Sequence, residues 1–443
     1  MVFMSKYVSR SRSCLRRMND ARSSAPPPAA ARRFFNDNIG ASMVVFQVFL
    51  PFALGYFLSY LFRVVNAVIA PNLIADLGLT AADLGLLTSA NFFAFAAFQL
   101  PLGILLDRYG PRKVESALLV VAAAGALVFG LAADTPGLVA GRAMIGFGTS
   151  ACLMAAFKAY SHWVPPQRQS LVTGIHMAFG GMGALTATKP VEMALAFTDW
   201  RGVFFILAGV TLVAAAYLFL AVPRRDRTES TETWGEMVAG IRRVFADPAF
   251  KRVAPASVLV QSGYLGVQSL WSGPWLRDVA GLAQAEMATG LLFIAAFMVA
   301  GFLSMGWIAD RLARAGVRTM AVATFGMSMF TLSLAVIALD PFADTTPVWY
   351  AFGLFGTFGI LPYTALSQTF PKELTGRVVT GLNVMVFFGA FAVQWGVGEI
   401  INQWPEPSPG HFAPEGYRWA FLIVAAMQAA GLSWYALYRK GRI

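Results

Sequence analysis

Twelve apolar stretches alternate with short polar turns along this chain, and this pattern predicts a bundle of transmembrane helices. Each stretch is close to the roughly 20 residues that an α-helix needs to cross the hydrocarbon core of a bilayer. The expected spans are 46–70, 85–105, 115–133, 137–160, 171–194, 203–222, 254–275, 287–307, 318–338, 348–368, 379–401 and 419–438. The predicted fold class is therefore an all-α membrane protein.

The longest polar segment between the spans divides them into two groups of six. It covers 224–252 and is rich in basic residues, and its stretch 233–245 has the pattern of an amphipathic helix that lies on a membrane surface. We therefore expect an N-terminal half over 43–223, a cytoplasmic linker over 224–252 and a C-terminal half over 253–438.

The two ends of the chain are expected to be cytoplasmic tails. Residues 1–42 are rich in Arg, Ser and Pro, a composition that is typical of disordered segments, and 439–443 form a short basic end. A transit peptide, or a true start at Met18 or Met43, is an alternative interpretation of the first tail.

Composition excludes most other classes of protein. Hydrophobic residues make up 57% of the 443 residues and charged residues 13%, whereas an average soluble domain is about 25% charged. These values exclude a disordered chain, a coiled coil and almost any cytosolic enzyme. Two cysteines form no disulfide framework, and the three histidines lie far apart. No nucleotide-binding or zinc-binding pattern occurs, so we expect no enzyme, no cofactor and no metal.

The net charge of +11 follows the predicted membrane topology. Most of the 34 Lys and Arg residues lie in the tails, the linker and the loops on one side of the bundle, which is the positive-inside pattern. The exceptions are Arg201, Arg277 and Arg418 on the other side, and Arg63, Arg142, Lys158 and Lys189 inside spans. We infer a bacterial inner-membrane protein with both termini in the cytoplasm. The basic charge therefore does not indicate a nucleic-acid partner.

An internal repeat relates the two groups of spans. Residues 103–113, after the second span, read GILLDRYGPRK, and residues 306–311, after the eighth, read GWIADR. His176 and Asn383 occupy equivalent positions in the fifth and eleventh spans, each two residues after a Thr-Gly pair. Two similar halves in the same orientation are typical of one large class of secondary transporters.

On these motifs the chain resembles the major facilitator superfamily over essentially all of its length after residue 43. The loop at 103–113 matches the family pattern G-x-L-x-D-R-x-G-x-R-K, and residues 142–148, RAMIGFG, resemble the family's fourth-span pattern. The resemblance implies twelve helices in two pseudo-symmetric six-helix halves, which rock about a central site to give alternating access. It also implies a secondary transporter of a small solute, expected here to be a monomer in the lipid bilayer.

The first span resembles a narrower branch, the organophosphate and organic-anion transporters, on residues 47–63, QVFLPFALGYFLSYLFR. This resemblance implies that Arg63 holds an anionic substrate. Phosphate-exchanging members of the branch also carry an arginine in the seventh span, but that span has no charge here. A single cation favours a monocarboxylate or a similar weak anion over a phosphate ester.

The first span also carries its own physical signal. A charge in the hydrocarbon core costs on the order of 3 kcal/mol and marks a functional position. Arg63 shares one helical face with Tyr60 and Asn66, and such a polar face must contact protein or a water-filled cavity. We expect these residues to bind substrate together with Tyr264 and Gln268 of the seventh span. The alternatives are an arginine paired to another helix for structure and, in the seventh span, side chains that anchor at the interface.

Each of the other ionisable residues inside the predicted spans can have one of two roles. Lys158 either lines the cavity or extends to the membrane interface. Arg142 has a coupling role by the family resemblance, or a packing role. His176 either carries a proton near neutral pH or is a hydrogen-bonded structural histidine. Glu192 and Lys189 form an outer gate or a structural ion pair. No Asp or Glu falls at the middle of a predicted span, so proton coupling is expected to use His176, an edge carboxylate such as Glu192, or the substrate's own proton.

The repeated loop motif is expected to act as a conformational latch. Gly103 would let helices approach closely, and Asp107 would accept charge-assisted hydrogen bonds from arginines or from the end of a neighbouring helix. A plain positive-inside loop explains the cations but not the aspartate with its glycines. The expected latch residues are Gly103, Asp107, Arg108, Gly110, Arg112, Asp310 and Arg311.

These observations favour a secondary transporter that takes up an organic anion together with a proton. An efflux carrier for amphipathic drugs or metabolites is the alternative, because the high aromatic content also suits an apolar cavity. A receptor or scaffold that has lost transport is a second alternative, which the complete loop motif disfavours.

Overall fold

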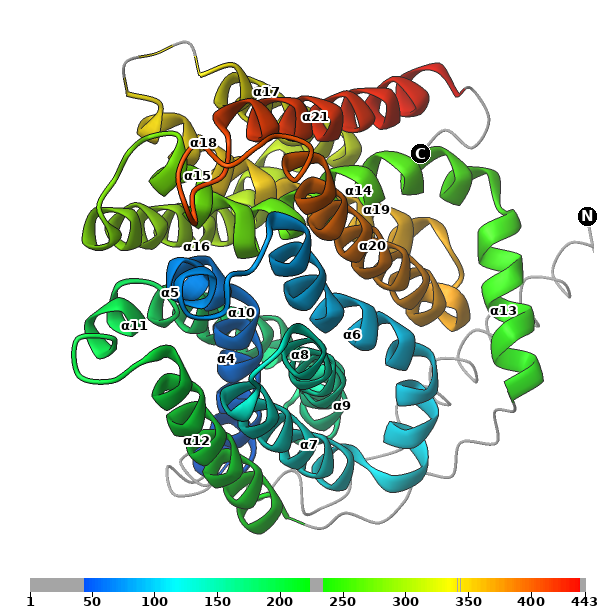
Figure 1. Cartoon of the computed structure of the whole chain (residues 1–443). Coiled ribbons are helices and arrows are strands. Elements are labelled where there is room, and N and C mark those ends of the chain that lie inside the picture. Colours follow the sequence, from blue (N-terminus) through cyan, green and yellow to red (C-terminus); the bar gives the residue numbers. More distant parts are fainter. Residues whose placement is uncertain (1–43, 224–233, 341, 343, 439–443) are drawn as a thin grey trace, which may run out of the picture.

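The computed structural model describes residues 44–223, 234–340, 342 and 344–438, and nearly all of them are helical (Figure 1). The predicted tails and linker residues 224–233 lie outside the described residues. Within the described part, nine helices are long and apolar enough to cross a membrane, and a shorter apolar helix lies at Leu171–Thr186. The predicted all-α membrane fold is confirmed.

The spans of the N-terminal half follow the predicted order, but several are interrupted by a turn. Its elements are η1 (Val45–Phe49), α4 (Leu50–Val64), α5 (Asn66–Leu77), α6 (Ala81–Tyr109), α7 (Pro111–Leu131), α8 (Thr135–Thr149), α9 (Cys152–Trp163), α10 (Pro166–Thr186), α11 (Lys189–Ala194) and α12 (Trp200–Ala221). The first span continues beyond its predicted end at residue 70 because α5 tolerates Pro71 and ends only at Gly78, which has the left-handed conformation (φ 61°).

The C-terminal half is also helical, again with local interruptions. Its elements are α14 (Pro248–Gly266), η2 (Val267–Trp271), α15 (Ser272–Asp278), α16 (Gln284–Arg314), α17 (Thr319–Leu339), α18 (Thr346–Gly356), η3 (Thr357–Ile360), α19 (Leu361–Thr369), α20 (Lys372–Ile401) and α21 (Pro414–Leu437). η2 is a π-helical turn and η3 a 3₁₀ turn, and both lie inside spans.

Polar residues fix where several helices begin. Thr80 and Asp83 form a capping box at the start of α6. The carboxylates of Asp134, Asp199 and Asp247 accept hydrogen bonds from first-turn amides of α8, α12 and α14. Below, the far end of the bundle is the end where α6, α8 and α12 begin, and the linker end is the opposite one.

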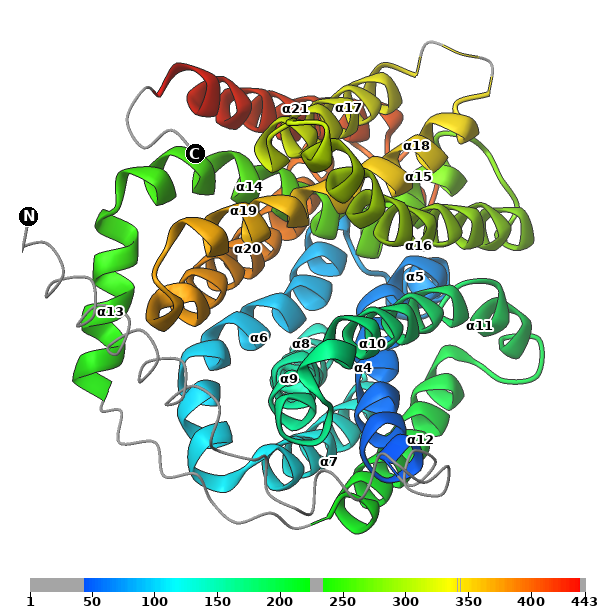
Figure 2. The ribbon, with the colours of Figure 1, turned by 180° about the vertical axis from the view of Figure 1, so that it is seen from behind.

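An aromatic seam joins the two halves, which lie against each other along α6 and α20 (Figures 1 and 2). Phe95 stacks on Phe387 with ring centroids 4.2 Å apart, and Phe93 contacts Phe388 at 5.5 Å. Closer to the far end, Gly398 leaves room for the backbone of Ala81, because a Cβ at this glycine would clash with that carbonyl. Small residues let helix backbones approach closely in membranes, so this seam can pack tightly.

One helix lies between the two groups of spans. Residues 234–246 form α13, which confirms a helix at 233–245 in the predicted linker. It packs against α20 at the linker end (Figure 2). Phe245 contacts Phe250 at 4.9 Å and approaches Gly381, and Arg377 lies over Gly240. This helix therefore contacts the bundle, a contact that the amphipathic pattern alone did not predict.

Candidate transport site

A cavity of about 500 Å³ lies between the halves, a size suited to a small ligand. Its polar lining residues are Tyr56, Ser59, Tyr60, Arg63, Gln99, Thr149, Ser150, Thr173, Gln261, Tyr363, Thr364 and Asn383. Its apolar lining residues are Phe95, Leu153, Met154, Phe157, Met177, Leu265, Ile360, Val379, Val386 and Phe387. Residues of both halves therefore line this cavity.

Arg63 is the one charged side chain among the described residues that line this cavity. It is 7% exposed, and it forms no ion pair with a described acidic residue. Its guanidinium lies 4.5 Å from the ring centre of Tyr60, 5.7 Å from that of Phe95 and 5.2 Å from that of Phe387. Aromatic faces stabilise a cation but do not neutralise it, so the arginine keeps its capacity to bind an anion.

The rest of the cavity offers neutral hydrogen-bonding groups. The side-chain amide of Gln99 donates to the Ser150 carbonyl at 3.2 Å. The Gln261 carbonyl oxygen of α14 is buried without a hydrogen-bond partner among the described residues, and Asn383 of α20 also lines the cavity. Such groups suit hydroxyl or other uncharged polar parts of a solute.

The structure places two of the predicted binding residues, Arg63 and Tyr60, on the cavity wall and the other four elsewhere. Asn66 lies one turn beyond Arg63 and donates a 2.8 Å hydrogen bond to Thr88. Tyr264 packs against the rings of Phe330 and Phe352, at 5.7 and 5.6 Å.

Gln268 lies in the π-helical turn η2, which is completely buried. Lys158 forms an ion pair with Asp107. The spacing of residues along a helix predicts a shared face, but this cavity occupies only part of the helix length. Phe95, Phe387 and Gln99, which the sequence did not single out, contribute to the wall instead.

The predicted latch has a different partner from the one expected. Asp107 of α6 pairs with Lys158 of α9, and not with an arginine of the loop motif. Arg112 donates to the Phe219 carbonyl at 2.7 Å and stacks on its ring, which fixes the loop to α12. In this conformation no other described helix comes within 4 Å of the position of a Cβ at Gly103, so a close helix contact at this glycine stays a prediction.

The remaining motif residues have local contacts. Gly110 has a φ of 79° and forms the sharp turn from α6 to α7. Arg108 stacks on Tyr109 at 5.5 Å, and Arg311 stacks on Trp307 at 5.3 Å in the second copy of the motif. Asp310 is exposed next to it. In this conformation the loop motif therefore shapes the linker end of each half.

The predicted coupling residues do not line the cavity. Arg142 is completely buried and donates to the Phe62 carbonyl at 2.8 Å, next to Arg63. His176 is also buried, and its Nδ1 lies 3.0 Å from the Tyr160 hydroxyl. These contacts make Arg142 a link between α8 and the arginine-bearing helix α4.

Glu192 and Lys189 form an ion pair of 2.7 Å in α11. Lys189 also donates to the Ala285 carbonyl of α16 at 3.4 Å, across the interface between the halves. Nearby, Gln284 donates to the Asn72 side chain at 3.0 Å. The far end of the cavity is therefore closed by contacts between the two halves.

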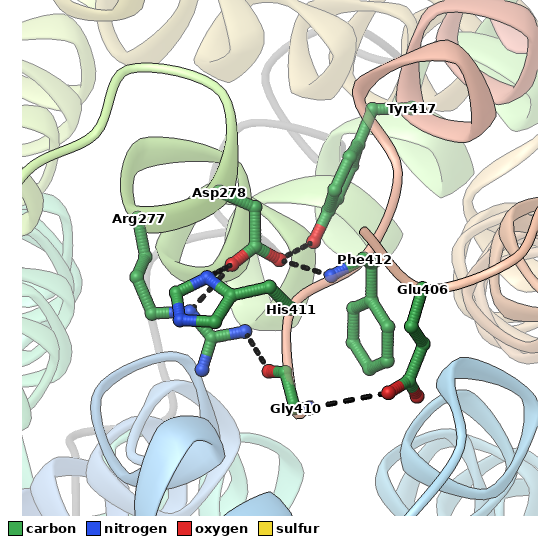
Figure 3. Close-up of polar contacts among 7 residues, drawn as sticks. All are labelled: Arg277, Asp278, Glu406, Gly410, His411, Phe412 and Tyr417. Atoms are coloured by element: carbon green, nitrogen blue, oxygen red, sulfur yellow. Dashed lines mark hydrogen bonds and ion pairs between the residues drawn. The ribbon is translucent and has the colours of Figure 1, made fainter. Parts of the chain in front are cut away.

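A buried aspartate organises the far end of the C-terminal half (Figure 3). The Asp278 carboxylate, at the end of α15, pairs with Arg277 at 2.6 Å and with His411 at 3.0 Å. It also accepts hydrogen bonds from the Tyr417 hydroxyl, at 2.8 Å, and from the Phe412 amide. These contacts hold the loop before α21 over the far end, and no local pattern in the sequence predicts this cluster.

Comparison with known proteins identifies the family. A profile of the Major Facilitator Superfamily matches residues 52–394, well over half of the chain. The chain belongs to the Major Facilitator Superfamily. The superfamily members that resemble it in sequence and in structure are named as transporters.

Two bacterial relatives share 27% identity with this superfamily member. The alignment with "Probable sulfoacetate transporter" of Cupriavidus necator covers 58% of this chain and 63% of the relative. The alignment with "Hexuronate transporter" of Escherichia coli covers 40% of this chain and 42% of the relative. The alignments therefore span less than two thirds of these relatives.

Solved structures confirm the major facilitator fold over most of the chain. A bacterial homologue of the human lysosomal transporter Spinster, in an inward-facing conformation, aligns with a TM-score of 0.71 and 19% identity, over 88% of this chain and 96% of that one. A D-xylose–proton symporter aligns with a TM-score of 0.69 and 15% identity, over 90% and 99%. At these identities the likeness concerns the fold alone.

Proposed function

We propose that this transporter takes up a small organic anion with one negative charge, that Arg63 binds the anionic group, and that a proton moves with it. The observation that best supports this proposal is the guanidinium of Arg63, which has no ion-pair partner among the described residues and lies in a cavity whose described walls hold no acidic side chain. A cationic solute is repelled by such a site and a neutral solute forms only ordinary hydrogen bonds with it, whereas a carboxylate forms charge-assisted hydrogen bonds with the guanidinium. The names of the sulfoacetate and hexuronate relatives agree with an anionic substrate.

The orientation follows from the positive-inside pattern. The linker end then faces the cytoplasm of a bacterial inner membrane. The cavity extends from Arg63 toward this end, because α9, α10 and α19 line it and lead to the loops there. The present conformation is then the one that exchanges substrate with the cytoplasm, and the protein works as a monomer.

An efflux carrier for amphipathic compounds is the second candidate. It is favoured by the aromatic part of the wall, which includes Phe95, Phe157 and Phe387. The two candidates differ in the charge of the solute that they carry.

Substrate charge separates these candidates directly. In proteoliposomes of purified protein, we expect saturable uptake of radiolabelled D-glucuronate, a hexuronate with one carboxylate, and slower uptake of divalent sulfoacetate. Xylose and a lipophilic cation are expected to cross no faster than in protein-free vesicles. Saturable flux of the cation without anion flux would contradict the proposal and support the efflux carrier.

Proton coupling gives a quantitative prediction. If one proton accompanies each monovalent anion, transport is electroneutral. A gradient of one pH unit, alkaline inside, then concentrates glucuronate about tenfold, since one pH unit is equivalent to about 1.4 kcal/mol. The measurement is steady-state accumulation with the membrane potential held at zero by potassium and valinomycin. Equal concentrations on both sides would show that no proton is coupled.

A further inference from the structure

A buried acid in α7 is not used by the site described so far. Glu115 is completely shielded from solvent. Neither oxygen of its carboxyl group has a hydrogen-bond partner among the described residues. An ionised carboxylate is strongly disfavoured in such a place, whereas the neutral acid is tolerated far better. The sequence suggested no role for this residue, because it stands at the edge of the predicted third span, next to basic residues.

Glu115 has neighbours in two helices. One is α4, which carries Arg63, and the other is α9, which follows the helix that carries Arg142. At Gly55 of α4 an added Cβ would clash with the Glu115 carboxyl oxygen and lie 3.6 Å from the Cys152 sulfur. Glycine at this position therefore leaves the space that the carboxyl group fills. The Cys152 thiol is a weak donor and does not replace an ionic partner.

The neighbouring helices α4 and α9 bring no described ion-pair partner to Glu115. Cys152 of α9 lies against the same glycine as the carboxyl group, Tyr56 of α4 follows that glycine directly, and Arg63 of α4 lines the cavity about two turns farther on. Lys158, the basic residue of α9, is paired with Asp107. No ion pair between Glu115 and a described basic residue exists to hold the ionised form.

Polar aromatic side chains of α4, α9 and α10 form a series of contacts that ends at the anion site. The Tyr160 hydroxyl is 3.0 Å from His176 Nδ1, and the His176 ring stacks on Tyr56 with ring centroids 4.6 Å apart. Tyr56 lines the cavity and contacts Tyr60, whose ring lies under Arg63. Tyr56, the residue that follows Gly55, thus connects the surroundings of the acid with the anion site.

We propose that Glu115 carries the transported proton, an inference that rests on the proton-coupled anion uptake proposed above. In the conformation described here the sealed carboxyl group holds its proton. Release breaks the carboxyl O–H bond, transfers the proton to a water molecule and leaves a carboxylate. The resulting carboxylate must be stabilised by water or by hydrogen-bond donors at the contact between α4 and α9. Water can enter this contact only if α4, the helix that bears Arg63, moves.

The arrangement also explains why anion and proton can bind together. One helix, α4, carries both Arg63 and Gly55, the glycine against which the Glu115 carboxyl group packs. Displacement of α4 therefore acts on the anion site and on the acid at once. By linkage, protonation of Glu115 strengthens anion binding by the same factor by which anion binding favours the protonated acid.

The variant Glu115→Gln tests this role, because its amide imitates the protonated acid in shape and charge. We expect it to exchange glucuronate across the membrane within about threefold of the wild-type rate, since exchange needs no net proton movement. We expect the tenfold accumulation driven by one pH unit to disappear. The matched control is Glu286→Gln, because this exposed carboxylate only accepts a hydrogen bond from the Ala283 amide at the start of α16, and a glutamine oxygen can accept the same bond. This control should accumulate glucuronate like the wild type.

The outcomes are distinct. Unchanged pH-driven accumulation in Glu115→Gln would overturn the inference while leaving the proposed function intact. Absence of pH-driven accumulation in the wild type would overturn it as well, and absence of all anion flux would overturn the proposed function itself. If Glu115→Gln does not fold, Glu115→Asp keeps an acid at the site. Its uptake should then remain coupled with a displaced pH profile, and an unchanged profile would contradict the inference.

Discussion

Replacement of Arg63 by glutamine is expected to abolish concentrative uptake of glucuronate and to lower kcat/KM at least about 100-fold. This corresponds to about 3 kcal/mol, within the range found when one partner of a desolvated charge pair is removed. The reason is that no other charged side chain in the described cavity wall can take over the anion. Initial rates of uptake into proteoliposomes over a range of glucuronate concentrations provide the measurement.

Two further variants control this experiment. Arg418→Gln removes an exposed arginine of α21, far from the cavity wall, and should leave uptake unchanged. Arg63→Lys keeps the charge but loses the planar fork and the stacking on Tyr60, so partial activity is expected. If Arg63→Gln carries glucuronate as well as the wild type does, the arginine is structural and the anion hypothesis fails.

The fold could be predicted from the sequence because its signal is local. Runs of apolar residues of membrane-spanning length, the loop motif and its second copy all lie within short windows. Local interruptions could not be predicted in the same way. The π-helical turn at 267–271 and the 3₁₀ turn at 357–360 are set by packing between the spans, which no single window of sequence contains.

The candidate site could be predicted only in part, for a geometrical reason. Periodicity identified the face of α4 that carries Tyr60 and Arg63, and both line the cavity. Periodicity could not show how far the cavity extends along the helix. The predicted binding residues therefore include Asn66, one turn farther along, whereas in the structure Asn66 is hydrogen-bonded to Thr88. The pairing of Asp107 with Lys158 joins residues 51 positions apart and depends on how α6 meets α9.

Glu115 shows a further limit of the sequence. Its neighbours along the chain, Arg112 and Lys113, suggest a polar loop at the membrane surface. The carboxyl group is nevertheless buried, because Gly55 of a different span opens a space for it. A glycine and an acid 60 positions apart carry no recognisable motif, and only the packing of α4 against its neighbours brings them together.

Removal of the ion pair between Asp107 and Lys158 by mutation is expected to slow the transport cycle without unfolding the protein. We expect Asp107→Asn and Lys158→Gln each to lower the maximal rate of glucuronate uptake about five- to tenfold, with little change in KM. The pair lies at the linker end and outside the cavity wall, so its loss alters the balance between conformations and not the anion contact itself. Uptake kinetics and thermal unfolding of the purified variants give the two measurements.

The charge-reversed pair distinguishes a conformational role from a merely local one. Asp107→Lys combined with Lys158→Asp restores the attraction between α6 and α9, so the double variant should regain a large part of the maximal rate that either single reversal loses. The coupling energy from this double-mutant cycle should appear in the rate and not in the unfolding temperature. Additive losses in the cycle would show that the two residues act separately. Equal losses of rate and thermal stability would show that the ion pair serves the fold. A rate-specific coupling would instead assign the pair to the opening and closing of the linker end, the step that must follow binding of the anion to Arg63.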